Sequence, residues 1–187
     1  MSRTQVTREV PATVPRPSAP TVDPGVRGHV RHLYVHAPFC RRRCVYCDFA
    51  VHVSGDPGSE GWENVVAKEW QLWKEAGVTT TPDLRTVYVG GGTPSVLPED
   101  AIPRFATSIG LTGAPDGSLE WTVEANPESF SGALASAWAR AGVNRISLGV
   151  QTFSPHGLRW MGRLHGPADV TSALLHARRA GITNLSV

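Results

Sequence analysis

Apolar residues recur along this chain in two alternating patterns, one typical of β-strands and the other of α-helices. Short apolar runs predict strands over residues 32–36, 86–89, 119–124, 145–150 and 183–187. Between them, apolar residues spaced three and four positions apart predict helices over residues 60–76, 99–109, 131–141 and 168–180. Gly77, Gly142 and Gly181 each follow one of these helical stretches. Glycine in that place is typical of a helix C-terminus, which supports the helix boundaries.

The alternation of strands and helices predicts an α/β fold in which crossover helices join parallel strands. A polar or glycine-rich cluster follows four of the strands, at residues 40–47, 90–94, 124–126 and 151. In a β/α barrel the carboxyl ends of the strands converge on one face, where functional sites lie. Because the sequence stops within the fifth predicted strand, we expect an incomplete (β/α) barrel that is truncated in that strand.

Residues 1–29 differ from the rest of the chain. They contain five prolines and show no apolar periodicity, so we expect a disordered tail, followed by one core domain over residues 30–187. The alternative is a mitochondrial-type transit peptide, since basic residues outnumber acidic ones there. The prolines disfavour that alternative, because a transit peptide needs an amphipathic helix.

The composition excludes several classes of protein. With 41% hydrophobic and 18% charged residues the chain is ordinary for a globular domain, and the net charge of +2 is too small to indicate nucleic-acid binding. No apolar run approaches the roughly 18 residues that a membrane span requires. The N-terminus has no apolar segment typical of a secretory signal. We therefore expect a cytoplasmic protein.

All three cysteines, Cys40, Cys44 and Cys47, lie within eight residues of one another. Three thiolates can hold three irons of a 4Fe-4S cubane and leave the fourth iron open. The amino and carboxylate groups of S-adenosylmethionine suit such an open iron. The alternative is a zinc site, whose fourth ligand would be His36, Asp48 or His52. The arginines at positions 41–43 would either offset the negative charge of a cluster and attract an anionic partner, or simply be solvated.

The other clusters carry less specific signals. The glycines of residues 90–92 let a backbone approach a ligand closely, although a tight turn would use them too. Glu124 ends a strand, where its carboxylate would accept hydrogen bonds from a ribose or an ammonium group, or would simply precede an Asn-Pro turn. Gln151 would bind a ribose hydroxyl, and Arg163 would pair with a carboxylate. Lone Gln and Arg residues are usually surface residues, so only their position after strands favours a binding role.

Five motifs occur in order, namely YVHAPFCRRRCVYCDF, VYVGGGTPS, TVEANPES, NRISLGVQTFS and MGRLH. Together they resemble the oxygen-independent coproporphyrinogen III oxidase group of radical-SAM proteins, and in particular its heme-chaperone branch. The resemblance covers residues 31–187. It implies a radical-SAM barrel, a 4Fe-4S cluster on the three cysteines, and heme as a further ligand. It also implies an electron donor and heme-accepting proteins as partners.

The resemblance also assigns positions to the cofactor. The residues that match those holding S-adenosylmethionine in the family are Tyr34, Gly91, Gly92, Thr93, Glu124, Gln151 and Arg163. Tyr46, within the cysteine loop, is expected to make a backbone contact. His36 and His165 are candidate heme ligands by chemistry, but a lone histidine is more often structural, so we assign neither as a ligand.

Phe49 distinguishes two activities within this group. The oxidases carry a further cysteine at this position, whereas the heme-chaperone branch carries phenylalanine, as this chain does. The resemblance therefore implies heme binding and delivery, and it assigns no catalytic residue. Three alternatives stay open: the oxidase of porphyrin biosynthesis, a non-catalytic zinc-binding structural module, and an inactive fragment. Whether the chain is an enzyme is thus undecided at this stage.

Overall fold

The computed structural model describes residues 28–53, 61–80, 84–111 and 118–187. Its centre is a parallel sheet in which all five predicted strands pair in the order β2-β6-β7-β8-β9. These strands are β2 (His32–Ala37), β6 (Thr86–Gly91), β7 (Glu120–Ala125), β8 (Arg145–Leu148) and β9 (Asn184–Ser186). Each overlaps its predicted range, so the α/β class and the parallel arrangement are confirmed.

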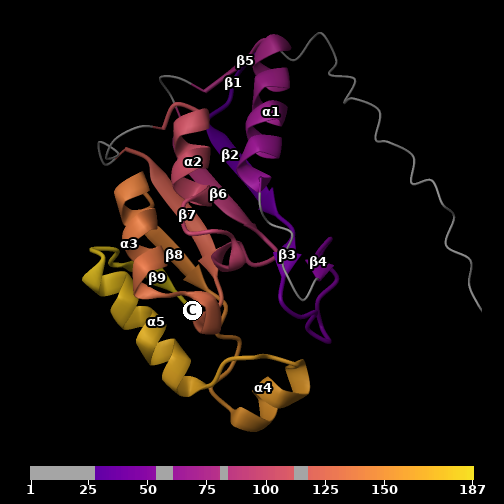
Figure 1. Cartoon of the computed structure of the whole chain (residues 1–187), viewed down its shortest axis with the longest axis vertical. Helices are drawn as coiled ribbons and strands as arrows, with labels where there is room; N and C mark the ends of the chain where they lie inside the picture. Colours follow the sequence, from indigo (N-terminus) through magenta and orange to yellow (C-terminus); the bar gives the residue numbers. More distant parts are fainter. Residues whose placement is uncertain (1–27, 54–60, 81–83, 112–117) are drawn as a thin grey trace, which may run out of the picture.

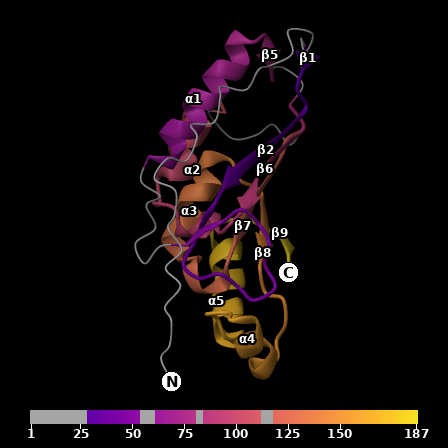
Figure 2. The same cartoon turned by 90° about the vertical axis from the view of Figure 1, so that its right-hand side faces the viewer.

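The four predicted helices are also present and cover one face of the sheet, as Figures 1 and 2 show. They are α1 (Trp62–Glu75), α2 (Ala101–Ser108), α3 (Gly132–Ala141) and α5 (Pro167–Arg179). The side chain of Ser131 caps α3 by accepting a hydrogen bond from the amide of Leu134, and Gly142 ends it in the left-handed conformation. Each helix leads from one parallel strand toward the next, as crossover connections require.

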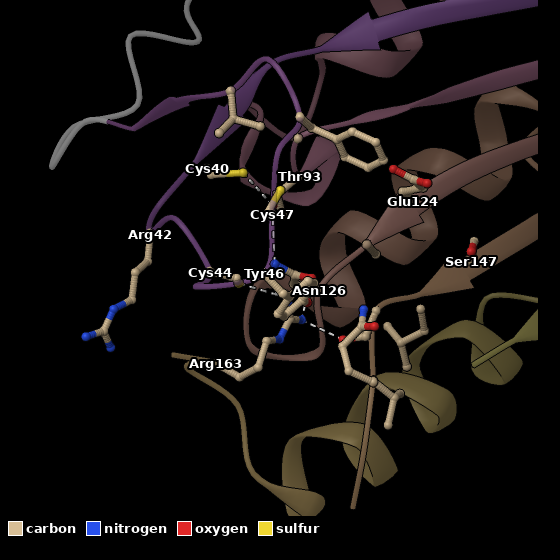
Figure 3. A pocket seen from close by; sticks show the side chains of 18 of the residues that line it. Cys40, Arg42, Cys44, Tyr46, Cys47, Thr93, Glu124, Asn126, Ser147 and Arg163 are labelled. Carbon is tan, nitrogen blue, oxygen red and sulfur yellow. Dashed lines mark hydrogen bonds between the residues drawn. The ribbon is translucent and has the colours of Figure 1, made fainter. Parts of the chain in front are cut away.

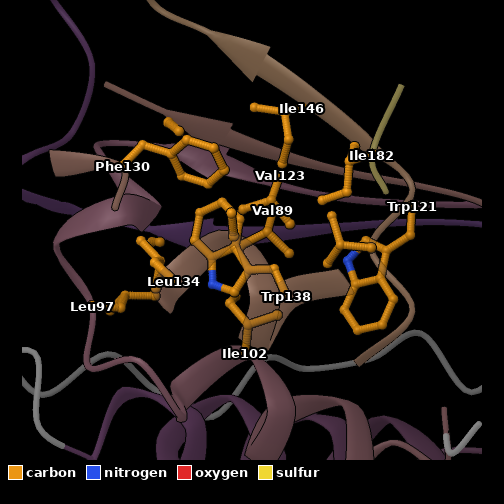
Figure 4. Close-up of a cluster of buried hydrophobic side chains, with 14 of the residues drawn as sticks. Val89, Leu97, Ile102, Trp121, Val123, Phe130, Leu134, Trp138, Ile146 and Ile182 are labelled. Atoms are coloured by element: carbon orange, nitrogen blue, oxygen red, sulfur yellow. The ribbon is translucent and has the colours of Figure 1, made fainter. Parts of the chain in front are cut away.

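The core lies between this face of the sheet and the helices (Figure 4). Alternate residues of each strand enter it, for example Val87 and Val89 from β6 and Trp121 and Val123 from β7, all of which are almost fully buried. Trp138 of α3 packs among them and is inaccessible to solvent. This alternation turns the remaining strand residues toward the opposite face.

The opposite face of the sheet is polar. It carries Tyr88 from β6, Glu124 from β7, and Arg145 and Ser147 from β8, which alternate with the core residues of the same strands. Arg145 donates to Thr122 Oγ1 and to a serine hydroxyl of β9, both at 3.1 Å. Polar side chains on this face therefore lie close to the strand ends where the predicted site residues cluster.

The structure adds elements that the apolar pattern did not predict. Gly28 and His29, which we placed in the tail, form β1 and pair in parallel with β5 (Val78–Thr79), so the tail boundary was two residues too late. The rest of the predicted tail lies outside the described residues. A seven-residue helix, α4 (Pro155–Met161), follows β8. Two 3-10 turns, Pro94–Val96 and Pro127–Ser129, follow β6 and β7.

Two further short strands, β3 (Phe39–Cys40) and β4 (His52–Val53), pair with each other at the two ends of the cysteine loop. Two-residue strands have no periodicity for a sequence pattern to reveal. Within the described part of the chain, no helix is long and apolar enough to cross a membrane.

Candidate functional site

A pocket of about 620 Å³ lies at the carboxyl ends of β6, β7 and β8, beside the cysteine loop. All but one of the predicted site residues line it, as Figure 3 shows for seven of them. These residues are Cys40, Cys44, Tyr46, Cys47, Gly91, Gly92, Thr93, Glu124, Gln151 and Arg163. The exception is Tyr34. Parallel topology explains the convergence, because it brings strand ends that are far apart in sequence to one edge of the sheet.

The cysteine loop is held in place by backbone hydrogen bonds at several points. The amide of Cys47 donates to the carbonyl of Cys44 at 3.1 Å, and the amide of Val45 donates to the carbonyl of Met161 at the end of α4, at 3.2 Å. Arg43 Nε donates to the carbonyl of Cys47 at 3.3 Å. The loop is thus attached both to itself and to α4, which lies after β8.

The three thiols are all free and half-buried, and they face the same pocket. Burial raises the pKa of the Cys40 thiol, and the neighbouring thiols act in the same direction. In the described residues no three His, Cys, Asp or Glu side chains stand close enough to share one metal ion. A cubane does not require this, because each of its thiolate ligands binds a different iron atom. The donor set therefore fits a cluster with one iron left open toward the pocket.

A run of polar contacts crosses the floor of the pocket. The hydroxyl of Thr93 lies 3.3 Å from Cys40 Sγ, and Asn126 Nδ2 donates to the same hydroxyl at 3.2 Å. Arg163 Nη2 donates to Asn126 Oδ1 at 2.7 Å, while its Nη1 lies 3.7 Å from Cys44 Sγ. These four contacts connect the two cysteines through side chains that follow β6, β7 and α4.

Arg163 is held on one side and unpaired on another. Its Nη2 also donates to the carbonyl of Gly149 at 2.5 Å and lies 3.4 Å from His165 Nδ1. Its Nε is buried, and no described residue accepts a hydrogen bond from it. A buried donor without an acceptor is costly, so an anionic group of a ligand beside it would be favourable. This fits the predicted pairing with a carboxylate.

Glu124 is anchored through both of its carboxylate oxygens. Tyr88 Oη donates to Oε1 at 2.6 Å, and the amide of Gly91 donates to Oε2 at 2.9 Å. Burial, together with the neighbouring carboxylate, raises the pKa of Tyr88 to about 12. A carboxylate accepts about four hydrogen bonds. Glu124 therefore orders the glycine loop and retains capacity for a ligand in the pocket.

The glycine loop needs glycine for steric reasons. Gly91 has φ +106°, and a Cβ there would stand 2.2 Å from the ring of His36. A Cβ on Gly92 would stand 2.6 Å from the carbonyl oxygen of Ala37. The amide of Gly92 donates to that same carbonyl at 2.9 Å. The loop therefore runs directly against β2 and the start of the cysteine loop.

Tyr34 lies outside the pocket lining. Its hydroxyl bonds His36 Nδ1 at 3.1 Å, and its ring stacks on that of Tyr88 at 6.0 Å. His36 Nε2 donates in turn to the carbonyl of Ala50 at 3.0 Å. Tyr34 therefore lies one residue away from the pocket, next to Gly91, and its assignment to the cofactor stays a prediction.

Neither candidate histidine presents a free ring nitrogen. His36 uses both nitrogens as described above. His165 has a fully buried side chain, and its Nε2 lies 3.2 Å from the carbonyl of Val150. Burial lowers the pKa of His165, and the charge of Arg163 acts in the same direction. Both histidines therefore have partners within the protein.

Gln151 has an unusual backbone conformation. Its φ of +65° makes it the only residue other than glycine with a positive φ in the described parts of the chain. Such a conformation costs about 1–3 kcal/mol and is found preferentially at functional sites. Gln151 lies at the rim of the pocket and is exposed to solvent.

Several residues that line the pocket were not predicted, and Asn126, Ser147 and Phe153 are among them. Asn126 was interpreted only as part of an Asn-Pro turn, although it is the central member of the polar run. Ser147 and Phe153 also line the pocket. The position of Ser147 two residues after the start of the predicted strand was the available signal, because period two places it on the same face as Arg145.

These features define an α/β protein that has a binding pocket at the carboxyl ends of parallel strands and a three-cysteine loop at its rim. Residues 34–187 match the family model of the Radical SAM superfamily, and the chain belongs to this superfamily.

Three heme chaperones are similar to this chain in sequence. Heme chaperone HemW of Bacillus subtilis is 36% identical over 159 residues, which cover 84% of this chain and 41% of that protein. HemW of Lactococcus lactis is 39% identical, with 82% and 39% covered, and HemW of Escherichia coli is 32% identical, with 83% and 41% covered. The resemblance to the heme-chaperone branch is thereby confirmed. The chain spans about two fifths of the length of these relatives.

The fold is also similar to a solved structure. Coproporphyrinogen III oxidase (HemN) from Escherichia coli, a radical SAM enzyme, aligns with a TM-score of 0.73 and 24% identity, covering 86% of this chain and 37% of that one. At this level of identity the similarity concerns the fold alone. It confirms the expected fold class, in which the described sheet corresponds to part of a radical-SAM barrel.

Proposed function

We propose that this chain holds a 4Fe-4S cluster on Cys40, Cys44 and Cys47, binds S-adenosylmethionine beside it, and acts as a heme chaperone that delivers heme to acceptor proteins. The observation that carries the proposal is the convergence of the three thiols with Thr93 and Arg163 on one pocket. When bound, the cluster supplies an open iron for the amino acid end of the cofactor and an electron.

The residues of the pocket have distinct roles in this proposal. Arg163 pairs with the carboxylate of S-adenosylmethionine through its buried, unpaired Nε. Gly91 and Gly92 present their backbone to the ligand along the pocket wall, and Glu124 accepts a hydrogen bond through its remaining lone pairs. Gln151, at the rim, binds a ribose hydroxyl. Two tyrosines complete the proposed set of cofactor-binding residues. Tyr34 lies beside the glycine loop, and Tyr46 lies within the cysteine loop.

Heme is the cargo, and the apolar part of the same pocket is its proposed contact surface. Phe49 and Phe153 line the pocket and are 66% and 60% exposed. Exposed aromatic side chains bind the face of a porphyrin well, since both surfaces are flat and apolar. Arg42 and Arg43 also line the pocket, and Figure 3 shows Arg42 on the same loop as Cys40 and Cys44. Their charges suit the heme propionates.

The proposal includes an electron donor and a reducing compartment. The arginines of residues 41–43 are all exposed on the cysteine loop, so an acidic donor protein would be attracted to the part of the surface nearest the cluster. Three free cysteines in one loop suit the cytoplasm, where thiols stay reduced.

One pair of assays separates the chaperone from the oxidase. The anaerobically reconstituted chain is titrated with heme and followed by absorbance, and in parallel it is incubated with reductant, S-adenosylmethionine and coproporphyrinogen. Both assays are repeated on a version that spans the full length of the relatives. The proposal expects saturable heme uptake and no protoporphyrinogen. Conversion above a trace, or no heme uptake by either version, would contradict it.

A further inference from the structure

We propose that Asn126 is a positioning residue that sets the reduction potential of the cluster by orienting hydrogen-bond donors toward the sulfurs of Cys40 and Cys44. Asn126 touches neither sulfur itself. It stands between Thr93 and Arg163, which do (Figure 3). The inference rests on the proposed function, because it requires the three thiolates to be cluster ligands.

The guanidinium of Arg163 fixes the direction of every hydrogen bond in this run. A guanidinium only donates, so the atom of the Asn126 carboxamide that faces it at 2.7 Å must be the oxygen, Oδ1. The amide nitrogen, Nδ2, then faces Thr93 at 3.2 Å, where it donates to the hydroxyl oxygen. The orientation of the carboxamide thus follows from its partners and is not a free choice.

The direction of the last bond follows from the same logic. Because Thr93 Oγ1 accepts from Asn126, its own hydrogen is free to point to Cys40 Sγ at 3.3 Å. A thiolate that ligates iron carries no proton and only accepts, so the contact is a donation from Thr93 to sulfur. At the other end, Arg163 Nη1 points its donor at Cys44 Sγ at 3.7 Å. One carboxamide therefore sets donors on two of the three ligand sulfurs.

Packing holds Asn126 in this orientation. Its backbone amide donates to Ser95 Oγ at 3.0 Å. A Cβ on Gly149 would stand 2.8 Å from Asn126 Oδ1 and 3.3 Å from Arg163 Nη2, so only glycine at that position lets the two groups meet. The carbonyl of Gly149 accepts from the same Nη2 at 2.5 Å. The pair is thus confined from both sides, as expected for groups that orient metal ligands from behind.

Hydrogen bonds to cluster sulfurs are a recognised determinant of reduction potential, because they stabilise the more negative, reduced state. Replacing Asn126 by aspartate reverses the direction of the hydrogen bond between residue 126 and Thr93. The new carboxylate still accepts from Arg163, but it cannot donate, so the Thr93 hydroxyl turns toward it and away from Cys40. Asn126→Asp is therefore expected to lower the potential. Asn126→Ala is expected to lower it less, because alanine removes the group that directs the Thr93 hydroxyl and the Arg163 guanidinium but offers neither of them a new acceptor.

Asn144 offers a matched control. Its carboxamide also bonds at both ends, accepting from the amide of Trp121 and donating to the carbonyl of Leu119, each at 2.8 Å. These contacts lie at the opposite ends of the strands, away from the cysteines. Asn144→Asp is therefore expected to change stability without changing the potential of the cluster.

The test is an anaerobic redox titration, followed by electron paramagnetic resonance, of the reconstituted wild type and these variants. We expect a tenfold shift in the equilibrium for one-electron reduction in Asn126→Asp, which is a lowering of about 59 mV, and no shift in Asn144→Asp. A loaded Asn126→Asp protein with the wild-type potential would overturn this inference and leave the proposed function intact. A wild type that assembles no cluster would overturn both.

If neither Asn126 variant assembles a cluster, Thr93→Val and Thr93→Ser decide the question. Serine keeps the hydroxyl and valine removes it at similar volume. A lower potential in Thr93→Val together with the wild-type potential in Thr93→Ser supports the inference. Equal potentials in these two variants contradict it.

Discussion

The guanidinium of Arg163 and the carboxamide of Asn126 meet at 2.7 Å in the pocket although 37 residues separate them in the sequence. Asn126 follows β7 and Arg163 follows α4, so their contact joins the end of a strand to the segment after a helix. It also leaves Arg163 Nε buried and unpaired beside the pocket. Five predictions concern this contact and its surroundings, in addition to the experiments proposed above.

Arg163→Lys is expected to weaken the binding of S-adenosylmethionine by roughly ten- to hundredfold. A lysine keeps the charge but loses the planar donor set, and one charge-assisted hydrogen bond is worth about 1.5–3 kcal/mol. The measurement is isothermal titration calorimetry on the reconstituted protein. Arg159→Lys is the control, because Arg159 is exposed on α4 and does not line the pocket. Equal affinities for wild type and Arg163→Lys would refute this role.

Gly91→Ala is expected to destabilise the chain more than Gly181→Ala. Both glycines have positive φ, +106° and +88°, so both substitutions incur the left-handed penalty of about 1–2 kcal/mol. Nothing lies within 4 Å of a Cβ at Gly181, whereas one at Gly91 would overlap the ring of His36. The difference between the two free energies of unfolding, measured in urea, isolates the steric cost. Identical losses would show that the loop has room to relax away from β2.

The extent of agreement between sequence and structure has physical reasons. The five strands and four long helices were predicted because each buries a regular apolar face, such as that of Val87 and Val89 in β6. Helix α4 was missed because it has only seven residues, with Gly157 in its interior, and β3 and β4 are too short for any period. The apolar pattern therefore predicted the central sheet and its covering helices, but it did not predict the short elements around the site.

The residues of the site were predicted from their motifs and from the family resemblance, but the contacts between them were not predicted. The contact between Thr93 and Cys40 spans 53 residues, and that between Arg163 and Cys44 spans 119. No spacing rule links residues so far apart, since such contacts arise only from strand order. Tyr34 was assigned to the cofactor from the family resemblance alone, and in the structure its hydroxyl bonds His36 Nδ1.

Tyr88 is expected to give the chain a pH-dependent stability above pH 10. The pKa of Tyr88 rises from 10.0 to about 12 on folding, so its contribution to stability is complete below pH 10 and is lost as the pH rises from about 10 to 12. Tyr88→Phe should therefore show a shallower decline of unfolding free energy over this range. At neutral pH the same variant should lose about 0.5–1.5 kcal/mol, because Glu124 loses a donor. Denaturant titrations at several pH values provide the measurement. Parallel declines for wild type and Tyr88→Phe would contradict the expectation.

Phe49→Ala is expected to weaken heme binding by roughly tenfold, since burying a phenylalanine contributes about 1.5–3 kcal/mol. Trp160→Ala is a matched control, because Trp160 is also 66% exposed but lies on α4 outside the pocket lining. Absorbance titration with heme measures both. A larger loss in Trp160→Ala than in Phe49→Ala would move the proposed heme surface from the pocket to α4.

The most direct test of the central claim is the content of iron and sulfide per chain after anaerobic reconstitution, measured together with the charge-transfer absorbance. The three half-buried thiols on one pocket predict roughly four irons and four sulfides per chain, a brown protein, and loss of the absorbance band in Cys44→Ala but not in the neighbouring Val45→Ala. One bound zinc without sulfide, or an unchanged band in Cys44→Ala, would contradict the account.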